Sequence, residues 1–150
     1  MTAFVALYLV TGLAALAIAW LKGGHPERLG VVIWLAGWAL ALLVNDLRFG
    51  DLRWAVALLD LAAFAAYLWL ALRYDRWWPL GVSACLLLSI AMHAAVLLTP
   101  EITPLAEASA QLGFGMLGVL IQAAGAFERW LAGEAPVSAS AVWGRRQRAT

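Results

Sequence analysis

Residues 77–98 read WWPLGVSACLLLSIAMHAAVLL, a run of 22 residues in which His93 is the only acidic or basic residue. An α-helix rises about 1.5 Å per residue, so a helix of this length crosses the ~30 Å hydrocarbon core of a bilayer. No water reaches that core, and a helix satisfies its backbone hydrogen bonds within one segment. The run therefore predicts a transmembrane helix with Pro79 in its first turn, where a proline loses no hydrogen bond.

Four other runs of this kind fill most of the chain. The helices predicted from all five cover residues 3–21, 26–45, 52–72, 77–98 and 104–127, and the apolar part of the second begins at Leu29. Their connections are very short, so we predict an all-α protein: a bundle of five transmembrane helices over residues 1–130 and a flexible tail over 131–150. No basic residue precedes the first run and Lys22 follows it, which favours a retained helix over a cleaved signal peptide.

The composition supports the lipid bilayer as the first partner and excludes several functions. Hydrophobic residues make up 65% of the chain and charged residues 13%, about half of the ~25% that soluble domains carry. Three arginines in the tail are too few for a nucleic-acid footprint. One cysteine and two distant histidines do not form a usual zinc site, and His25 and His93 lie too far apart to ligate one haem. We therefore expect no metal, no other cofactor and no nucleic acid.

The basic residues predict the orientation of the bundle. Two of the ten, Arg48 and Arg53, lie on one side of the membrane. The other eight lie on the opposite side: Lys22, Arg28, Arg73, Arg76, Arg129, Arg145, Arg146 and Arg148. The positive-inside rule then predicts a cytoplasmic C-terminus and an external N-terminus. Abundant Ala, Leu and Arg beside a single Lys favour a bacterial protein, and hence the inner membrane.

Polar residues inside the predicted helices call for a reason, because a charged side chain at the membrane centre costs ~2.5–3.5 kcal/mol on insertion scales. Asp60 and His93 fall at nearly the same depth on antiparallel helices. Four more polar side chains lie at this level, near the outer ends of helices: Asn45, Asp46, Glu107 and Gln111. These six residues predict an intramembrane polar cluster. It is either a packing contact between helices or a site for a proton, an ion or a small ligand.

The last predicted helix and the tail carry two further patterns. Small and polar residues three or four apart form a stripe along one helix face: Gly115, Gly118, Gln122 and Gly125. Small residues allow close helix contacts, so we expect the stripe to pack against protein. The tail carries a tryptophan and three arginines that suit anionic lipid or a cytoplasmic partner: Trp143, Arg145, Arg146 and Arg148.

These features favour a non-enzymatic structural or accessory subunit, because no recognisable catalytic motif accompanies them. It would assemble with itself or with a larger membrane complex through the stripe and the tail. A second hypothesis is a proton- or ion-linked channel or carrier in which Asp60 titrates and His93 is its partner. A third is a membrane enzyme that acts on a lipid substrate at the polar cluster.

Overall fold

The computed structural model describes residues 2–47, 52–99 and 101–133, and within these ranges the chain forms five helices. They are α1 (Thr2–Lys22), α2 (His25–Val44), α3 (Trp54–Tyr74), α4 (Trp78–Leu98) and α5 (Pro104–Leu131). All five are long and apolar enough to span a membrane. The predicted fold class, an all-α multi-pass membrane bundle, is confirmed.

Local sequence explains where the helices begin. Proline occupies the first turn of α2, α4 and α5, where its missing N–H costs nothing. The Thr103 hydroxyl caps α5 by accepting the Ala106 N–H at 3.2 Å, which satisfies one of the free donors of the first turn. Most helix ends agree with the predicted ends to within two residues. However, α5 runs four residues past 127, because the helix continues through the charged residues Glu128 and Arg129, and Arg129 contacts Glu27 of α2.

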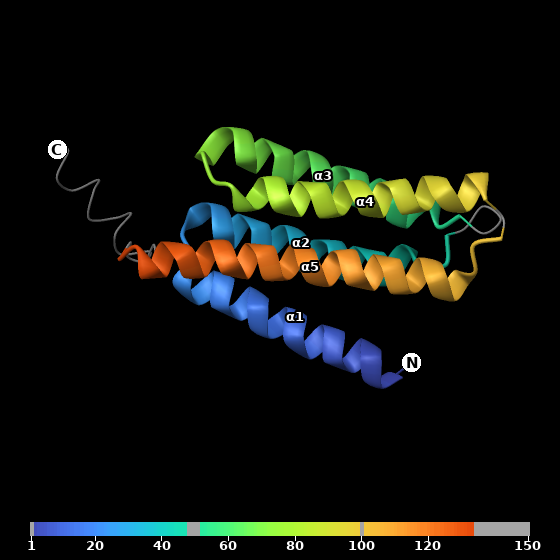
Figure 1. Ribbon diagram of the computed structural model, residues 1–150, viewed down its shortest axis with the longest axis horizontal. Coiled ribbons are helices and arrows are strands. Elements are labelled where there is room, and N and C mark those ends of the chain that lie inside the picture. The colour runs from blue at the N-terminus through green and yellow to red at the C-terminus, as the bar shows by residue number, and fades with distance from the viewer. Residues whose placement is uncertain (1, 48–51, 100, 134–150) are drawn as a thin grey trace.

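The helices form a ring in which each one packs against its neighbour in the chain, and α5 closes the ring against α1. Additional contacts join α5 to α2. Figure 1 shows that α1 diverges from α5 toward its N-terminus. We call the end of the bundle that holds the start of α1 the N-terminal end. The opposite end, where α5 terminates, is the C-terminal end.

Large aromatic residues form the centre of the bundle. Tyr67 and Trp78 are almost completely buried, with ring centroids 6.1 Å apart. The ring centroid of Trp34 lies 6.2 Å from that of Tyr67. The outward leucines, by contrast, are exposed by as much as 83% at Leu42. Such an apolar exterior suits lipid rather than water.

Candidate functional site

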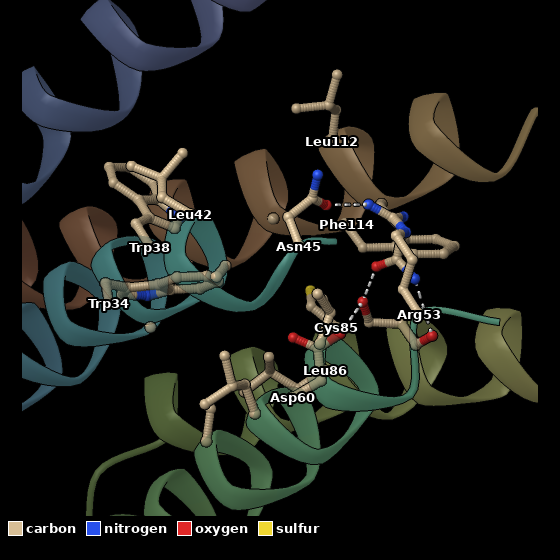
Figure 2. A pocket seen from close by; sticks show the side chains of 18 of the residues that line it. Trp34, Trp38, Leu42, Asn45, Arg53, Asp60, Cys85, Leu86, Leu112 and Phe114 are labelled. Atoms are coloured by element: carbon tan, nitrogen blue, oxygen red, sulfur yellow. Dashed lines mark hydrogen bonds between the residues drawn. The ribbon is translucent and has the colours of Figure 1, made fainter. Parts of the chain in front are cut away.

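A cavity of about 700 Å³ lies between the helices, and Figure 2 shows part of its lining. Along α3 it extends from Arg53 near the N-terminal end to Tyr67, about 20 Å deeper. Exposed Leu42 and the exposed α1 residues Val5 and Leu9 lie on its rim. The cavity therefore has a polar mouth at the N-terminal end, a floor at Tyr67 and an apolar rim along α1 and α2.

The wall formed by α3, α4 and α5 carries hydrogen-bonded polar groups. The Ser89 hydroxyl donates to Asp60 Oδ2 at 2.8 Å and is also in contact with Gln111 Oε1. Gln111 Nε2 donates to the Ser89 carbonyl oxygen at 3.2 Å and lies 3.1 Å from His93 Nε2. Three helices are thus joined through side chains that border the cavity.

His93 lies between two carboxylates. Its Nε2 is 3.3 Å from Asp60 Oδ2, and its Nδ1 is 3.5 Å from Glu107 Oε1. Glu107 accepts from Arg53 Nη2 at 2.9 Å, and Arg53 Nη1 donates to Asn45 Oδ1 at 3.5 Å. We call these seven residues the cavity network: Asn45, Arg53, Asp60, Ser89, His93, Glu107 and Gln111.

The order of contacts in the cavity network decides what chemistry it suits. Ser89, His93 and Asp60 are the residue types of a hydrolytic triad, in which the histidine stands between the serine and the carboxylate. Here Asp60 stands between the other two, since both Ser89 and His93 contact the same carboxylate oxygen. No hydrogen bond joins Ser89 to His93 in the described part of the chain. This arrangement can hold a proton or a positive charge, and its order of contacts differs from that of the hydrolytic triad.

Aromatic side chains form the opposite wall. Trp34 and Trp38 extend from α2 beside the cavity (Figure 2), and Tyr8 of α1 packs on Trp38 with ring centroids 5.6 Å apart. Trp34 is 9% exposed. Within residues 2–47, 52–99 and 101–133, no atom accepts a hydrogen bond from its buried Nε1. The wall therefore offers aromatic faces and one unused donor.

A second polar network lies beyond the cavity floor, toward the C-terminal end. Glu27 is fully buried; its carboxylate accepts from the Gly24 N–H at 2.7 Å and from Trp78 Nε1 at 3.1 Å. Arg129 Nη1 lies 3.8 Å from the same carboxylate.

Gln122 extends this second network to Tyr67. Gln122 Nε2 donates to the Glu27 carbonyl oxygen at 3.0 Å, and the Tyr67 hydroxyl lies 2.8 Å from both Gln122 Oε1 and the Gly30 carbonyl oxygen. We call these residues the sealed network: Gly24, Glu27, Gly30, Tyr67, Trp78, Gln122 and Arg129.

The structure brings most of the predicted polar cluster together. Asp60, His93, Glu107 and Gln111 are in direct contact, and Asn45 joins them through Arg53. Asp46 is exposed at the cavity mouth and makes no hydrogen bond or ion pair with the described residues of the cavity network.

The predicted stripe on α5 faces the interior of the bundle. A Cβ added to Gly115 would meet Tyr8 of α1, one on Gly118 would meet Trp34 of α2, and one on Gly125 would meet Trp78 of α4. Gln122, the fourth member, belongs to the sealed network. The predicted tail residues Trp143, Arg145, Arg146 and Arg148 lie outside the described residues.

Sequence reasoning missed the roles of Arg53 and Glu27. Arg53 counted only as an orientation signal, although it is the cation that pairs with Glu107. Glu27 follows Pro26 in a first turn, where an acidic residue is ordinary, so nothing in the sequence marked it as buried. Ser89 left a signal, because it lies four residues before His93 on the same helix face.

Comparisons with known proteins give no information about function, so the functional argument depends on the site itself. No protein-family model matches the chain, and no curated protein or solved structure matches it. Within the described residues, no group of three or more His, Cys, Asp or Glu side chains is placed to hold a metal ion.

Proposed function

We propose that the protein is a non-enzymatic membrane protein that binds a small amphipathic molecule between its helices and exchanges it with the surrounding lipid. The size of the cavity supports this proposal, since ligand sites commonly measure ~300–1,000 Å³. Its lining supports it as well. Mostly apolar walls with a few convergent polar groups are typical of small-molecule sites.

The unpaired indole N–H of Trp34 carries the proposal. A buried donor without an acceptor costs about 1–3 kcal/mol, and such groups in a protein interior call for a reason. Trp34 lines the cavity, so a molecule that carries an acceptor and occupies the cavity would remove this cost.

The rim supports exchange with lipid rather than with water alone. Leu42, Val5 and Leu9 are apolar and exposed where they border the cavity. The apolar part of a ligand would therefore pass between α1 and α2 into the acyl chains. In the orientation that the basic residues predict, the ligand would come from the outer leaflet.

Cys85 provides the test, because it is the only cysteine in the sequence and it borders the cavity. The rate of its alkylation by N-ethylmaleimide is measured by mass spectrometry in proteoliposomes. Gly37→Phe fills the cavity, since Gly37 lines it and an added Cβ meets open space. Gly113→Phe is the matched control: Gly113 is equally open, but it lies in a groove between α1 and α5.

We expect Gly37→Phe to slow alkylation severalfold and Gly113→Phe to leave the rate unchanged. We also expect mass spectrometry of the purified proteins to find a co-purifying small molecule with wild type and Gly113→Phe, and to lose it with Gly37→Phe. Equal alkylation rates in the two variants would reject the cavity as an accessible site. Identical extracts from the two variants would reject it as the place where the molecule binds.

The groove between α1 and α5 favours a second candidate, the accessory subunit. It measures about 590 Å³ and contains Ser109 and Gly113, two small residues one helical turn apart that allow another helix to approach closely. The α5 stripe is occupied inside the bundle, so this groove is the better assembly surface. Gly113→Leu should convert an oligomer to a monomer in mild detergent, as measured by light scattering. A wild-type monomer with no co-purifying protein would count against assembly.

Hydrogen counting in the cavity network favours the proton-linked carrier as a third candidate. The Ser89 hydroxyl has one hydrogen but contacts two oxygens, Asp60 Oδ2 and Gln111 Oε1. A proton on Asp60, or a reversed Gln111 amide, supplies the second hydrogen. A pH gradient across proteoliposomes should then drive proton flux that Asp60→Asn abolishes. Flux equal to that of protein-free liposomes at every pH would contradict it.

A further inference from the structure

We infer that the molecule bound in the cavity is a lipophilic organic cation, held by the Asp60 carboxylate on one wall and by the aromatic faces of Trp34, Trp38 and Tyr8 on the other. This inference rests on the proposed function and names its ligand class. It follows from three features of the lining: the sign of the charge, the exposure of Asp60 to the cavity, and the aromatic wall.

More acidic than basic groups surround the cavity. The acidic groups of the described residues here are Asp46, Asp60 and Glu107, and the basic ones are Arg53 and His93. With all three acids ionised, they exceed one arginine and one histidine by at least one negative charge. Arg53 is already paired with Glu107 at 2.9 Å and offers little positive charge to a ligand.

Asp60 is the carboxylate that a ligand in the cavity would meet. Its side chain is 22% exposed, whereas the side chains of its neighbour His93 and of Glu107 are 3% and 8% exposed. Asp60 and Ser89 both line the cavity. In a medium of low dielectric constant the attraction between opposite charges is much stronger than in water, so an ionised Asp60 attracts a cation and repels an anion.

The aromatic wall adds a second source of selectivity for a cation. A cation over a tryptophan or tyrosine face gains up to ~2 kcal/mol or more when water is excluded. Trp34 and Trp38 have ring centroids 6.2 Å apart, and Tyr8 continues the wall. The apolar remainder of the cavity suits hydrophobic substituents around the charge. Trp34 Nε1 suits an acceptor atom on the same molecule.

The test uses two probes of the same shape and opposite charge. Tetraphenylphosphonium and tetraphenylborate both carry four phenyl groups around one central atom. Each is added to proteoliposomes of zwitterionic phosphatidylcholine, and its effect on the alkylation of Cys85 by N-ethylmaleimide is measured relative to the same protein without probe. We expect the cation to slow alkylation severalfold and the anion to leave it nearly unchanged.

Substitutions test whether this protection depends on the Asp60 carboxylate. Asp60→Asn should lose most of the protection by tetraphenylphosphonium, and Asp60→Glu, which keeps the charge, should retain it. Glu128→Gln is the matched control, because it removes an acidic group from the exposed C-terminal end, far from the cavity. It should be protected like wild type. If Asp60→Asn does not fold, Tyr8→Leu removes part of the aromatic wall instead and should weaken protection.

Three results would overturn the inference: equal protection by both probes, full protection of Asp60→Asn, or no protection by tetraphenylphosphonium. In that case slower alkylation of Gly37→Phe would still support the proposed function with a ligand of another class. Equal rates for Gly37→Phe and Gly113→Phe would remove the proposed function itself, so the two failures are distinguishable.

Discussion

The cavity network and the sealed network contain similar chemical groups but differ in what surrounds them. Each holds a carboxylate, a glutamine and a hydroxyl from three different helices. In the sealed network, Glu27 and Gln122 are completely buried and Trp78 packs directly on Gly125. In the cavity network, Asp60 remains partly exposed and borders about 700 Å³ of space.

This difference teaches how to separate a structural polar contact from a candidate site inside a membrane bundle. Polar residues in lipid are costly in both cases. The sealed network uses its carboxylate on partners within the protein and leaves no room for a ligand. The cavity network leaves part of its carboxylate uncovered. A polar group is a candidate site when it borders free volume, not when it is merely buried.

The largest expected effect is on the sealed network. Glu27→Ala removes the acceptor of Trp78 Nε1 and of the Gly24 N–H, and it removes the carboxylate that lies 3.8 Å from Arg129 Nη1. Breaking a buried ion pair in this way costs about 3–5 kcal/mol. Thermal unfolding in detergent measures the loss. Glu128→Ala, at the same end but exposed, should change stability by less than about 1 kcal/mol. Similar losses for Glu27→Ala and Glu128→Ala would show that burial does not make the Glu27 carboxylate more important for stability.

Gly125→Ala should destabilise the bundle by about 1–3 kcal/mol, because overpacking a filled core forces side chains to shift. An added Cβ would lie 2.8 Å from Trp78 Cβ, and that atom cannot move without the α4 backbone. Chemical unfolding in detergent measures the effect. An unchanged stability would show that α4 and α5 are not packed as closely as described.

Tyr67→Phe tests the boundary between the sealed network and the cavity, at the cavity floor. Removal of its hydroxyl leaves the Gly30 carbonyl oxygen and Gln122 Oε1 without this donor, and we expect a loss of about 1 kcal/mol. Tyr8→Phe, on the cavity side, should cost less. The melting temperatures of the two variants measure these losses. A larger loss for Tyr8→Phe would mean that the Tyr8 hydroxyl beside the cavity contributes more to stability than the Tyr67 hydroxyl.

Gly37→Ala should give the smallest effect and the opposite sign. An added Cβ at Gly37 meets no atom within 4 Å, and alanine stabilises a helix interior by roughly 0.5–1 kcal/mol relative to glycine. We expect a slightly raised melting temperature. A lowered one would mean that the space beside Gly37 is filled, which contradicts the cavity as described.

The fold was predictable because the bilayer reduces the problem to composition and length. Long apolar runs leave the helix as the structure that satisfies the backbone, and proline marks the helix starts. The depth of Asp60 and His93 followed from the rise per residue and the antiparallel order of α3 and α4. Their contact at 3.3 Å agrees with that reasoning.

The composition of the networks was not predictable in the same way. Gln122 lies on one helix face with Gly118 and Gly125, yet that pattern does not say which helix covers the face. The ion pair of Arg53 with Glu107 joins residues 54 positions apart, and no local spacing encodes it. Sequence patterns describe the faces of single helices, whereas contacts depend on how helices are arranged around the bundle.

The sequence by itself determined the apolar, all-helical character of the chain and the position of each polar residue along its helix, because these depend on single helices. Only the tertiary structure decided which polar groups meet, which are sealed and which border free volume. Five helices can be arranged in several orders, and the packing of Trp34, Tyr67 and Trp78 against small residues selects one. That packing leaves the space beside Asp60 open and closes the space around Glu27.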